Sequence, residues 1–265
     1  MVRWQLTGIE GEMGGYPAAE MLAPGLDETP LVPDEQGQCL LVPRDDSPDY
    51  EHLLARVRAL LDPSRPNWVV LPHVQREHRH WWEQQLASVA EPGFGRGSVA
   101  LALSQMDRLA TPARLIAVHR PDEDTPGIEG AIALDWHPTE ERGLAFDLTR
   151  MDGRLDGKTD VGALLKLGRD TITQPEALLC PGTGGDGYLE RLLPFLAELG
   201  PWAGQAVRWE FPEARLGRLG VVGSLYSWAW LEAGYRLGDW SAPCAILEMD
   251  DSEMVGLSVV RWQPS

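Results

Sequence analysis

The sequence predicts an α/β fold in which a mostly parallel sheet is covered by helices on both faces. Apolar runs of four or five residues alternate with segments whose apolar residues recur at the i, i+3 and i+4 spacing of an amphipathic helix. Continuous short apolar runs are typical of strands that are buried on both faces. The two halves of the chain repeat this rhythm, each as βαβαβ followed by two strands. At 265 residues the chain is long enough to bury a large core.

In the first half, apolar runs predict strands at residues 4–9, 68–71, 115–118 and 131–134. Helical spacing predicts helices at residues 50–61, 73–89 and 98–109, with a break at residues 92–97. Residues 17–48 are rich in Pro, Asp, Glu and Gly, which predicts a loop that holds one brief strand at residues 38–42.

In the second half, the same patterns predict strands at residues 144–148, 177–180, 206–209, 244–249 and 255–262. Helices are expected at residues 161–167, 188–199 and 222–236. We therefore expect two similar halves, residues 1–150 and residues 151–265.

Composition and charge disfavour a nucleic-acid-binding protein, a membrane protein and a metalloprotein. The formal net charge of −17 disfavours binding to nucleic acid or to anionic membranes, and favours solubility or a basic partner. No apolar run approaches the roughly 18 residues that a membrane helix needs, and no secretory leader is evident. The three cysteines, Cys39, Cys180 and Cys244, have no metal-ligand spacing. We therefore expect a cytoplasmic protein with reduced thiols and without a metal or a cofactor.

Tryptophan is unusually common, with 11 residues against four phenylalanines. Most should lie in the core, because a tryptophan buries a large area and needs only one hydrogen-bond partner. A minority could anchor a partner, since tryptophan is enriched at interface hot spots. The adjacent pair Trp81 and Trp82 is the candidate for such an interface.

Two turns in the second half carry a family resemblance. A predicted strand runs into Pro-Gly-Thr-Gly at residues 181–184, and Gly-Arg-Leu-Gly at residues 217–220 precedes a helix and two closing strands. This arrangement resembles the C-terminal half of a β-ketoacyl synthase, which has a His-Gly-Thr-Gly turn and a later Gly-His-x-Gly turn. By this resemblance, Pro181 and Arg218 stand where the two catalytic histidines would be.

The first half resembles the same family in the same order. Leu-Thr-Gly-Ile at residues 6–9 is similar to its opening strand, and residues 95–101 to its nucleophile elbow. Residues 113–118 with the acidic residues 122–124 resemble a later strand and turn, and residues 127–134 its closing Gly-Glu-Gly-Ala strand. The resemblance implies a thiolase-like fold, with duplicated βαβαβ-ββ halves layered α-β-α-β-α, in a chain shorter than a working ketosynthase.

The family's catalytic residues are missing from the matching positions. A ketosynthase needs a cysteine thiolate at a helix N-terminus and two histidines. No cysteine lies between Cys39 and Cys180, and the elbow instead reads Gly95, Arg96, Gly97 and Ser98. Proline has no side-chain proton to exchange, and an arginine such as Arg218 stays protonated. The resemblance therefore implies a relative that is not an enzyme.

Other candidate sites fit ordinary structure better. His73, His78 and His80 are five and two residues apart, which is not the i, i+4 spacing of a helical metal site. The glycine-rich residues 182–187 lack the Gly-Lys-Ser/Thr of a phosphate loop. Residues 223–227 lack the Gly-x-Ser-x-Gly frame of a hydrolase elbow.

Three functions stay open. The first is a non-catalytic thiolase-fold protein that binds other proteins, as a homodimer or heterodimer with a second ketosynthase-like chain or a secreted effector. Short, degenerate proteins of this type resemble accessory proteins encoded beside type VI secretion effectors, which implies an adaptor or chaperone-like role in effector loading. The second is an accessory subunit of a fatty-acid or polyketide ketosynthase, similar to a chain-length factor. The third is a divergent acyl-transfer enzyme that uses Ser98 or a histidine at residues 73–80.

Overall fold

The structure is a computed structural model, and it describes residues 2–21, 49–121, 127–152, 161–184, 187–250 and 254–263. The strand expected at residues 38–42, the acidic turn at residues 122–124 and most of the loop at residues 17–48 lie outside these ranges.

The described part of the first half contains the strands that the sequence predicts at residues 4–9, 68–71, 115–118 and 131–134. Its strands are β1 (Arg3–Met13), β2 (Tyr16–Pro17), β3 (Asn67–Leu71), β4 (Glu91–Phe94), β5 (Ala113–His119) and β6 (Gly130–Thr139). Its helices are α1 (Ala18–Met21), α2 (Asp49–Leu60), α3 (Arg79–Gln85) and α4 (Ser98–Leu109), with a 3-10 helix η1 (His73–His78) before α3. The helix expected at residues 73–89 is thus divided and shorter, whereas the one expected at residues 98–109 is confirmed.

The second half follows the predicted order closely. Its strands are β7 (Gly143–Asp152), β8 (Ala177–Leu179), β9 (Arg208–Glu210), β10 (Cys244–Met249) and β11 (Val255–Gln263). Its helices are α5 (Val161–Thr171), α6 (Tyr188–Leu192), α7 (Leu196–Leu199) and α8 (Val222–Leu237), with the 3-10 helices η2 (Leu193–Phe195), η3 (Gly200–Ala203) and η4 (Pro212–Arg215).

The sequence pattern does not predict β4, because Pro92 and Gly93 are poor strand formers. Proline removes a backbone N–H that a central strand would need for its ladder. Among the described strands, β4 pairs with β3 alone and lies at one edge of the sheet, where a missing donor is tolerated. With β4 in place, both halves have the same order of elements, βαβαβαββ.

The order of the strands across the sheet shows the duplication directly. It runs β4-β3-β5-β6-β1-β7-β11-β10-β8-β9. If the short strand β2, which lies off this path, is left out of the count, the order within the first half is third, second, fourth, fifth and first strand, and the second half has the same order reversed. The chain passes from one half to the other between the end of β6 and the start of β7. Residue 150, the expected boundary of the halves, lies within β7.

The sheet is mixed, which corrects the expectation of a mostly parallel one. β3 runs parallel to β4 and β5, and β8 runs parallel to β9 and β10. The closing strand of each half, β6 or β11, is antiparallel to both of its neighbours. The reason is that each half ends with two consecutive strands and no crossover helix between them, so the second strand must reverse direction.

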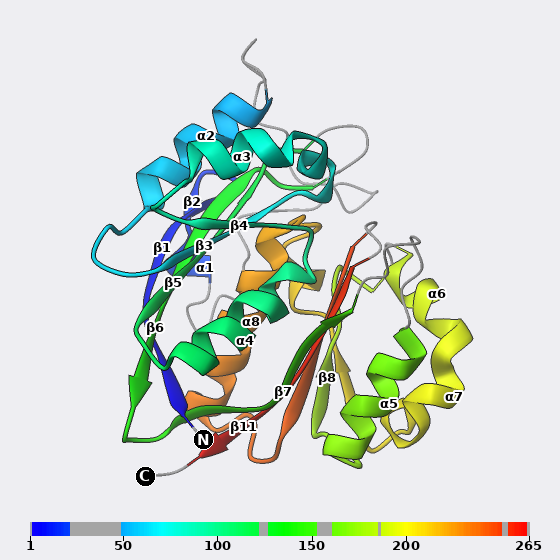
Figure 1. The fold of residues 1–265 in the computed structure, drawn as a ribbon. Helices are drawn as coiled ribbons and strands as arrows, with labels where there is room; N and C mark the ends of the chain where they lie inside the picture. Colours follow the sequence, from blue (N-terminus) through cyan, green and yellow to red (C-terminus); the bar gives the residue numbers. More distant parts are fainter. Residues whose placement is uncertain are drawn as a thin grey trace.

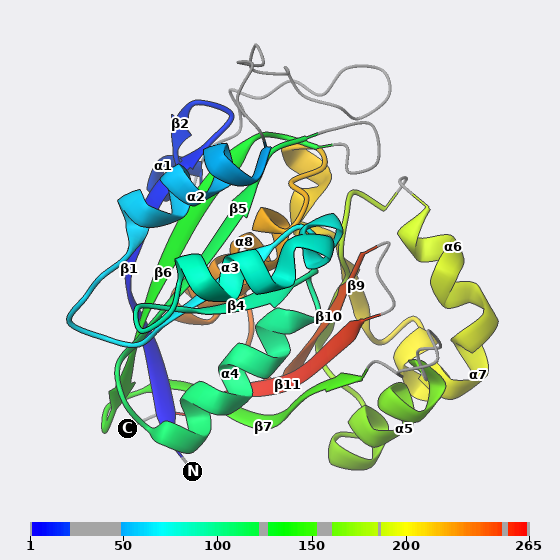
Figure 2. The ribbon, with the colours of Figure 1, turned by 45° about the horizontal axis from the view of Figure 1, so that its top comes forward.

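The elements form five layers, α-β-α-β-α (Figures 1 and 2). Helices α2 and α3 cover the outer face of the first-half sheet, and α5, α6 and α7 cover the outer face of the second. Helices α4 and α8 lie between the two halves of the sheet. The thiolase-like layering that the resemblance implies is confirmed.

Three apolar cores lie between these layers. Successive side chains of a strand point to opposite faces of the sheet, so alternate residues belong to different cores. In β5, Leu115 belongs to the inner core around α4 and α8, whereas Ile116 belongs to the outer core beneath α2 and α3. In β10, Ile246 faces the inner core and Leu247 the outer core beneath α5. Strands covered on both faces must be apolar throughout, which explains the continuous runs in the sequence. None of the helices in the described ranges is long and apolar enough to cross a bilayer.

Candidate functional site

Three turns of the chain meet between the N-termini of α4 and α8, although they are far apart in sequence. They are the elbow before α4, the turn after β8, and the turn before α8. The side chain of Glu213 joins all three. Its Oε1 accepts the Gly182 N–H at 2.9 Å and lies 2.6 Å from Arg96 Nη2, and its Oε2 accepts the Leu219 N–H at 2.8 Å. The structure thus brings together the segments that contain Arg96, Pro181 and Arg218.

Glycine shapes the elbow itself. Gly95 has a φ of 82°, a left-handed conformation that lets the chain turn from β4 into α4. A Cβ on Gly97 would lie 3.0 Å from the backbone of Met254, so a larger residue would push α4 away from the start of β11. The geometry of a strand-to-helix elbow is therefore present, with Arg96 and Ser98 but no cysteine in it.

Arg96 and Glu213 form an ion pair with almost no exposure, 2% and 1% of their side chains. Burial alone would lower the pKa of Arg96, but the charge of Glu213 raises this pKa above its ordinary value. The same guanidinium donates to the Gly220 carbonyl. A Cβ on Gly223, in the first turn of α8, would lie 2.4 Å from both Arg96 Nη2 and Glu213 Cδ. The pair therefore fills the space against the helix N-terminus.

Two more carboxyl groups from the end of β10 complete what we call the Arg96 cluster: Arg96, Glu213, Glu248 and Asp250. The backbone N–H of Arg96 donates to Asp250 Oδ2 at 2.7 Å. Burial raises the pKa of Glu248 to about 8, an effect that Arg96 opposes and Glu213 reinforces. The ring of Tyr188 lies 5.9 Å from the guanidinium carbon of Arg96, within cation-π range. One cation from the first half is thus surrounded by carboxyls of the second.

Ser98 points away from this cluster. Its hydroxyl donates to the Gly95 carbonyl at 2.7 Å, a local bond at the start of the helix. A Cβ on Gly93 would be 2.6 Å from Ser98 Cβ, which places the serine side chain against β4. His78 and His80 lie instead in the outer layer, with His78 against Tyr50 and His80 94% exposed. Neither pairs with Ser98.

The other two predicted positions carry no acid-base group either. Pro181 is buried, and Arg218 is half-buried, with its carbonyl accepting the Ile128 N–H at 2.7 Å. Cys180 precedes Pro181, but its side chain belongs to the outer core of the second half. Burial raises the pKa of the Cys180 thiol above its ordinary value, which makes a thiolate unfavourable there.

His119 also lies near these turns, and the sequence pattern identified neither it nor Glu213. His119 ends β5, is 2% exposed, and lies between two glycines of neighbouring segments. A Cβ on Gly220 would come within 2.4 Å of its ring, and one on Gly127 within 3.0 Å of Nε2. A polar residue at the C-terminal end of a buried strand is the signal that could have found it.

Trp81 and Trp82, the pair predicted as a possible interface, differ in their burial. Trp82 is fully buried beneath α2, and its indole N–H donates to Gln75 Oε1 at 3.2 Å. It therefore offers no surface to a partner. Trp81 is half-buried and packs edge-on against Tyr50, with ring centroids 4.8 Å apart, so the exposed surface of the pair belongs to Trp81.

Comparison with known proteins finds similar folds among solved structures. No protein-family model and no curated protein match the chain. Among solved structures, the ishigamide ketosynthase/chain length factor has a TM-score of 0.57 at 13% identity, covering 98% of this chain and 99% of that one. The tetronic acid condensing enzyme AbyA1 has a TM-score of 0.57 at 10% identity, covering 97% and 99%.

OleA from Xanthomonas campestris, solved with lauric acid and lauroyl-CoA, is also similar. Its TM-score is 0.51 at 11% identity, and the match covers 98% of this chain and 99% of that one. Likenesses at these identities show the fold alone. The chain has a thiolase-like fold of the kind found in ketosynthases, as the resemblance in its sequence implies.

Proposed function

We propose that this chain is a thiolase-fold protein without catalytic activity that works by binding another protein. The observation that supports this most is the Arg96–Glu213 ion pair, which occupies the meeting point of the three turns. The resemblance places the nucleophile and two histidines of a ketosynthase in these turns. An ion-paired, permanently protonated arginine can act neither as a nucleophile nor as a base.

Within this proposal, the role that the resemblance implies is an adaptor or chaperone-like protein for loading type VI secretion effectors. An accessory subunit similar to a chain-length factor is the alternative, and the likeness to the ishigamide ketosynthase/chain length factor favours it. Such a subunit has to tolerate an acidic acyl carrier protein, which a net charge of −17 makes harder. A divergent acyl-transfer enzyme has the least support, because the Ser98 hydroxyl donates to the Gly95 carbonyl of its own turn and, within the described residues, not to a histidine.

The free edge of β4 is the surface that we propose for the partner. Among the described residues, β4 pairs with β3 alone, so the backbone groups on its other edge have no described strand to pair with. Leu101 on α4 lines a shallow hollow together with Glu91 and Pro92 of β4, and is 41% exposed. Val89, just before β4, is 44% exposed. Family members normally dimerise through this strand, so the proposed partner is a second thiolase-fold chain, either another copy or a ketosynthase-like protein.

The purified chain is expected to show no condensation of acyl-thioesters and no thioester hydrolysis, since the elbow offers no activated nucleophile. Release of free thiol from acyl-CoA and acyl-carrier substrates measures both reactions. Turnover that disappears in Ser98→Ala would overturn the proposal and support the divergent enzyme. Pull-down with identification of the partner then separates the two binding roles, because capture of an active ketosynthase favours the chain-length-factor role.

Leu101→Glu is expected to weaken association at least tenfold, because it replaces an exposed apolar side chain beside β4 with a charge. Leu167→Glu is a matched control, since Leu167 is 40% exposed on α5, in the outer layer of the other half. Sedimentation velocity against protein concentration, alone and with the captured partner, measures the change. If Leu167→Glu weakens association and Leu101→Glu does not, the partner binds the second half instead.

A further inference from the structure

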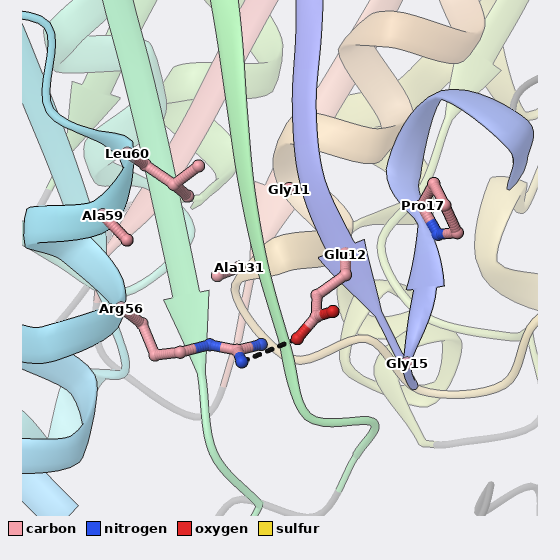
Figure 3. Close-up of a pocket in the computed structure, with 8 residues that line it drawn as sticks. All are labelled: Gly11, Glu12, Gly15, Pro17, Arg56, Ala59, Leu60 and Ala131. Carbon is pink, nitrogen blue, oxygen red and sulfur yellow. Dashed lines mark ion pairs between the residues drawn. The ribbon is translucent and has the colours of Figure 1, made fainter.

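An open cavity of about 370 Å³ lies on the outer side of the first-half sheet, away from the Arg96 cluster. It is bounded by α2, by the end of β1, and by the hairpin that leads into β2 (Figure 3). Its lining consists of Gly11, Glu12, Gly15, Pro17, Arg56, Ala59, Leu60 and Ala131. The volume is within the usual range of small-molecule sites, about 300–1,000 Å³.

Small residues create the hollow. A Cβ on Gly11 would lie 2.0 Å from the Ala131 carbonyl oxygen, so only glycine allows β1 and β6 to approach here. Gly15 has a φ of 83° in the hairpin, and a Cβ there would meet nothing within 4 Å. Ala59 and Leu60 of α2 form the facing wall. The cavity therefore has an apolar wall and a floor of backbone and methyl groups.

One ion pair spans this cavity. Arg56 Nη1 lies 2.7 Å from Glu12 Oε1, and the two side chains are 28% and 46% exposed. Figure 3 shows them reaching toward each other from α2 and β1. Within the described residues, Arg56 Nε and Nη2 and Glu12 Oε2 have no hydrogen-bond or ion-pair partner. The pair thus presents free donors beside a free anionic acceptor.

We propose that this cavity binds a free α-amino acid with a large apolar side chain. Its carboxylate accepts from the free nitrogens of Arg56, whose fork geometry suits a carboxylate. Its ammonium donates to Glu12 Oε2, and its side chain covers Leu60 and Ala131. A carboxylate without an ammonium group uses only Arg56, and an amine without a carboxylate uses only Glu12. The site is independent of the proposed protein partner.

The affinity is expected to be modest, with a Kd on the order of 1 mM, because the ion pair is partly exposed to solvent. L-phenylalanine is the probe. 3-Phenylpropanoate lacks its ammonium group and 2-phenylethylamine lacks its carboxylate, with little other change. Saturation-transfer NMR on the full chain should show binding of phenylalanine, and at least tenfold weaker binding of each analogue.

Four variants locate the site. Arg56→Met and Glu12→Gln should each weaken phenylalanine binding at least tenfold, and Ala59→Leu should abolish it by filling the cavity. Ala55→Leu is the matched control, because Ala55 is exposed on the same helix and does not line the cavity. Both alanines are exposed helical positions where leucine is well tolerated, and circular dichroism checks the fold.

Binding of phenylalanine that all four variants leave unchanged, or the absence of binding up to 10-fold above the expected Kd of about 1 mM, would overturn the proposal. Equal affinity for 3-phenylpropanoate and phenylalanine would overturn the amino-acid class and leave a simple carboxylate site. None of these outcomes bears on whether the chain is catalytic or which partner it binds.

Discussion

Glu213→Gln is expected to lower the free energy of unfolding by about 3–5 kcal/mol, the range for breaking a buried ion pair by removal of one partner. The glutamine keeps an oxygen that can accept one of the two backbone N–H groups now bonded to Glu213. It leaves Arg96 charged and buried without its main counter-ion. Urea unfolding at constant pH, followed by tryptophan fluorescence, measures the loss.

A double variant tests whether the Arg96–Glu213 pair stabilises the fold through its charges or through its packing. Arg96→Met with Glu213→Gln removes both charges, and we expect it to be more stable than Glu213→Gln alone, since no uncompensated cation remains. Glu83→Gln is the surface control, because the Arg79–Glu83 pair has the same charges but is exposed, and we expect no measurable change. If the double variant is as unstable as the sum of its single variants, the pair acts through packing and not through charge.

The contribution of Glu248 to the free energy of unfolding is expected to fall by an amount on the order of 5 kcal/mol as the pH rises from about 4.5 to about 8. Burial raises the pKa of Glu248 to about 8, from an ordinary value of about 4.5. In this interval the folded chain keeps the Glu248 proton and the unfolded chain has lost it. Folding therefore binds a proton, and this part of the stability is fully present below pH 4.5 and lost as the pH passes 8.

Glu248→Gln tests this assignment, because glutamine has no proton to lose. Relative to the wild type, we expect this variant to gain stability between pH 5.5 and pH 9, measured by urea unfolding in one buffer series. An equal pH slope in both proteins would assign the dependence to other groups. Arg96, Glu213 and Asp250 are the charged neighbours that set the pKa of Glu248, so the same titration in Glu213→Gln should shift toward lower pH.

Glu176→Gln provides a control, because Glu176 should make stability depend on pH in the direction opposite to Glu248. Burial alone would raise the pKa of Glu176, but bonds from the Ser241 and Ala242 N–H groups, at 2.8 and 2.7 Å, lower it below its ordinary value. Its carboxylate therefore stabilises the fold at neutral pH and loses this effect in acid. We expect Glu176→Gln to be less stable than the wild type at pH 7, and closer to it at pH 3.

Most of the fold could be predicted from the sequence because burial on both faces makes most strands continuously apolar. β5 and β10 are fully buried along their length, and their runs stand out without any alternation. β4 was not predicted, because an edge strand needs neither apolar residues nor every backbone N–H. It can therefore contain Pro92 and Gly93, which are poor strand formers. The antiparallel direction of β6 was not predicted either, since an apolar run does not indicate whether the neighbouring strand is parallel or antiparallel.

The candidate site was predictable only in part. The turns at Pro181 and Arg218 were found from motif order, and the structure joins their segments to the elbow through Glu213. The role of Arg96 was not predictable, because its partner lies more than a hundred residues away and only the folded chain brings them together. Glu213 follows Pro212 at the start of the short 3-10 helix η4, and no local sequence pattern marks this glutamate as buried.

The position of β11 has a consequence for how the chain is made. β11 lies between β7 and β10, and the direct pairing of β7 with β1 is confined to Trp4 and Leu144. Among the described strands, β10, β8 and β9 therefore connect to the rest of the sheet through β11, which follows all of them in the chain. On a translating ribosome, the first half can pair its strands while the second half must wait for residues 255–263. Until then β7 and β10 expose open edges, which makes this interval the period in which chaperone binding or misassembly would occur.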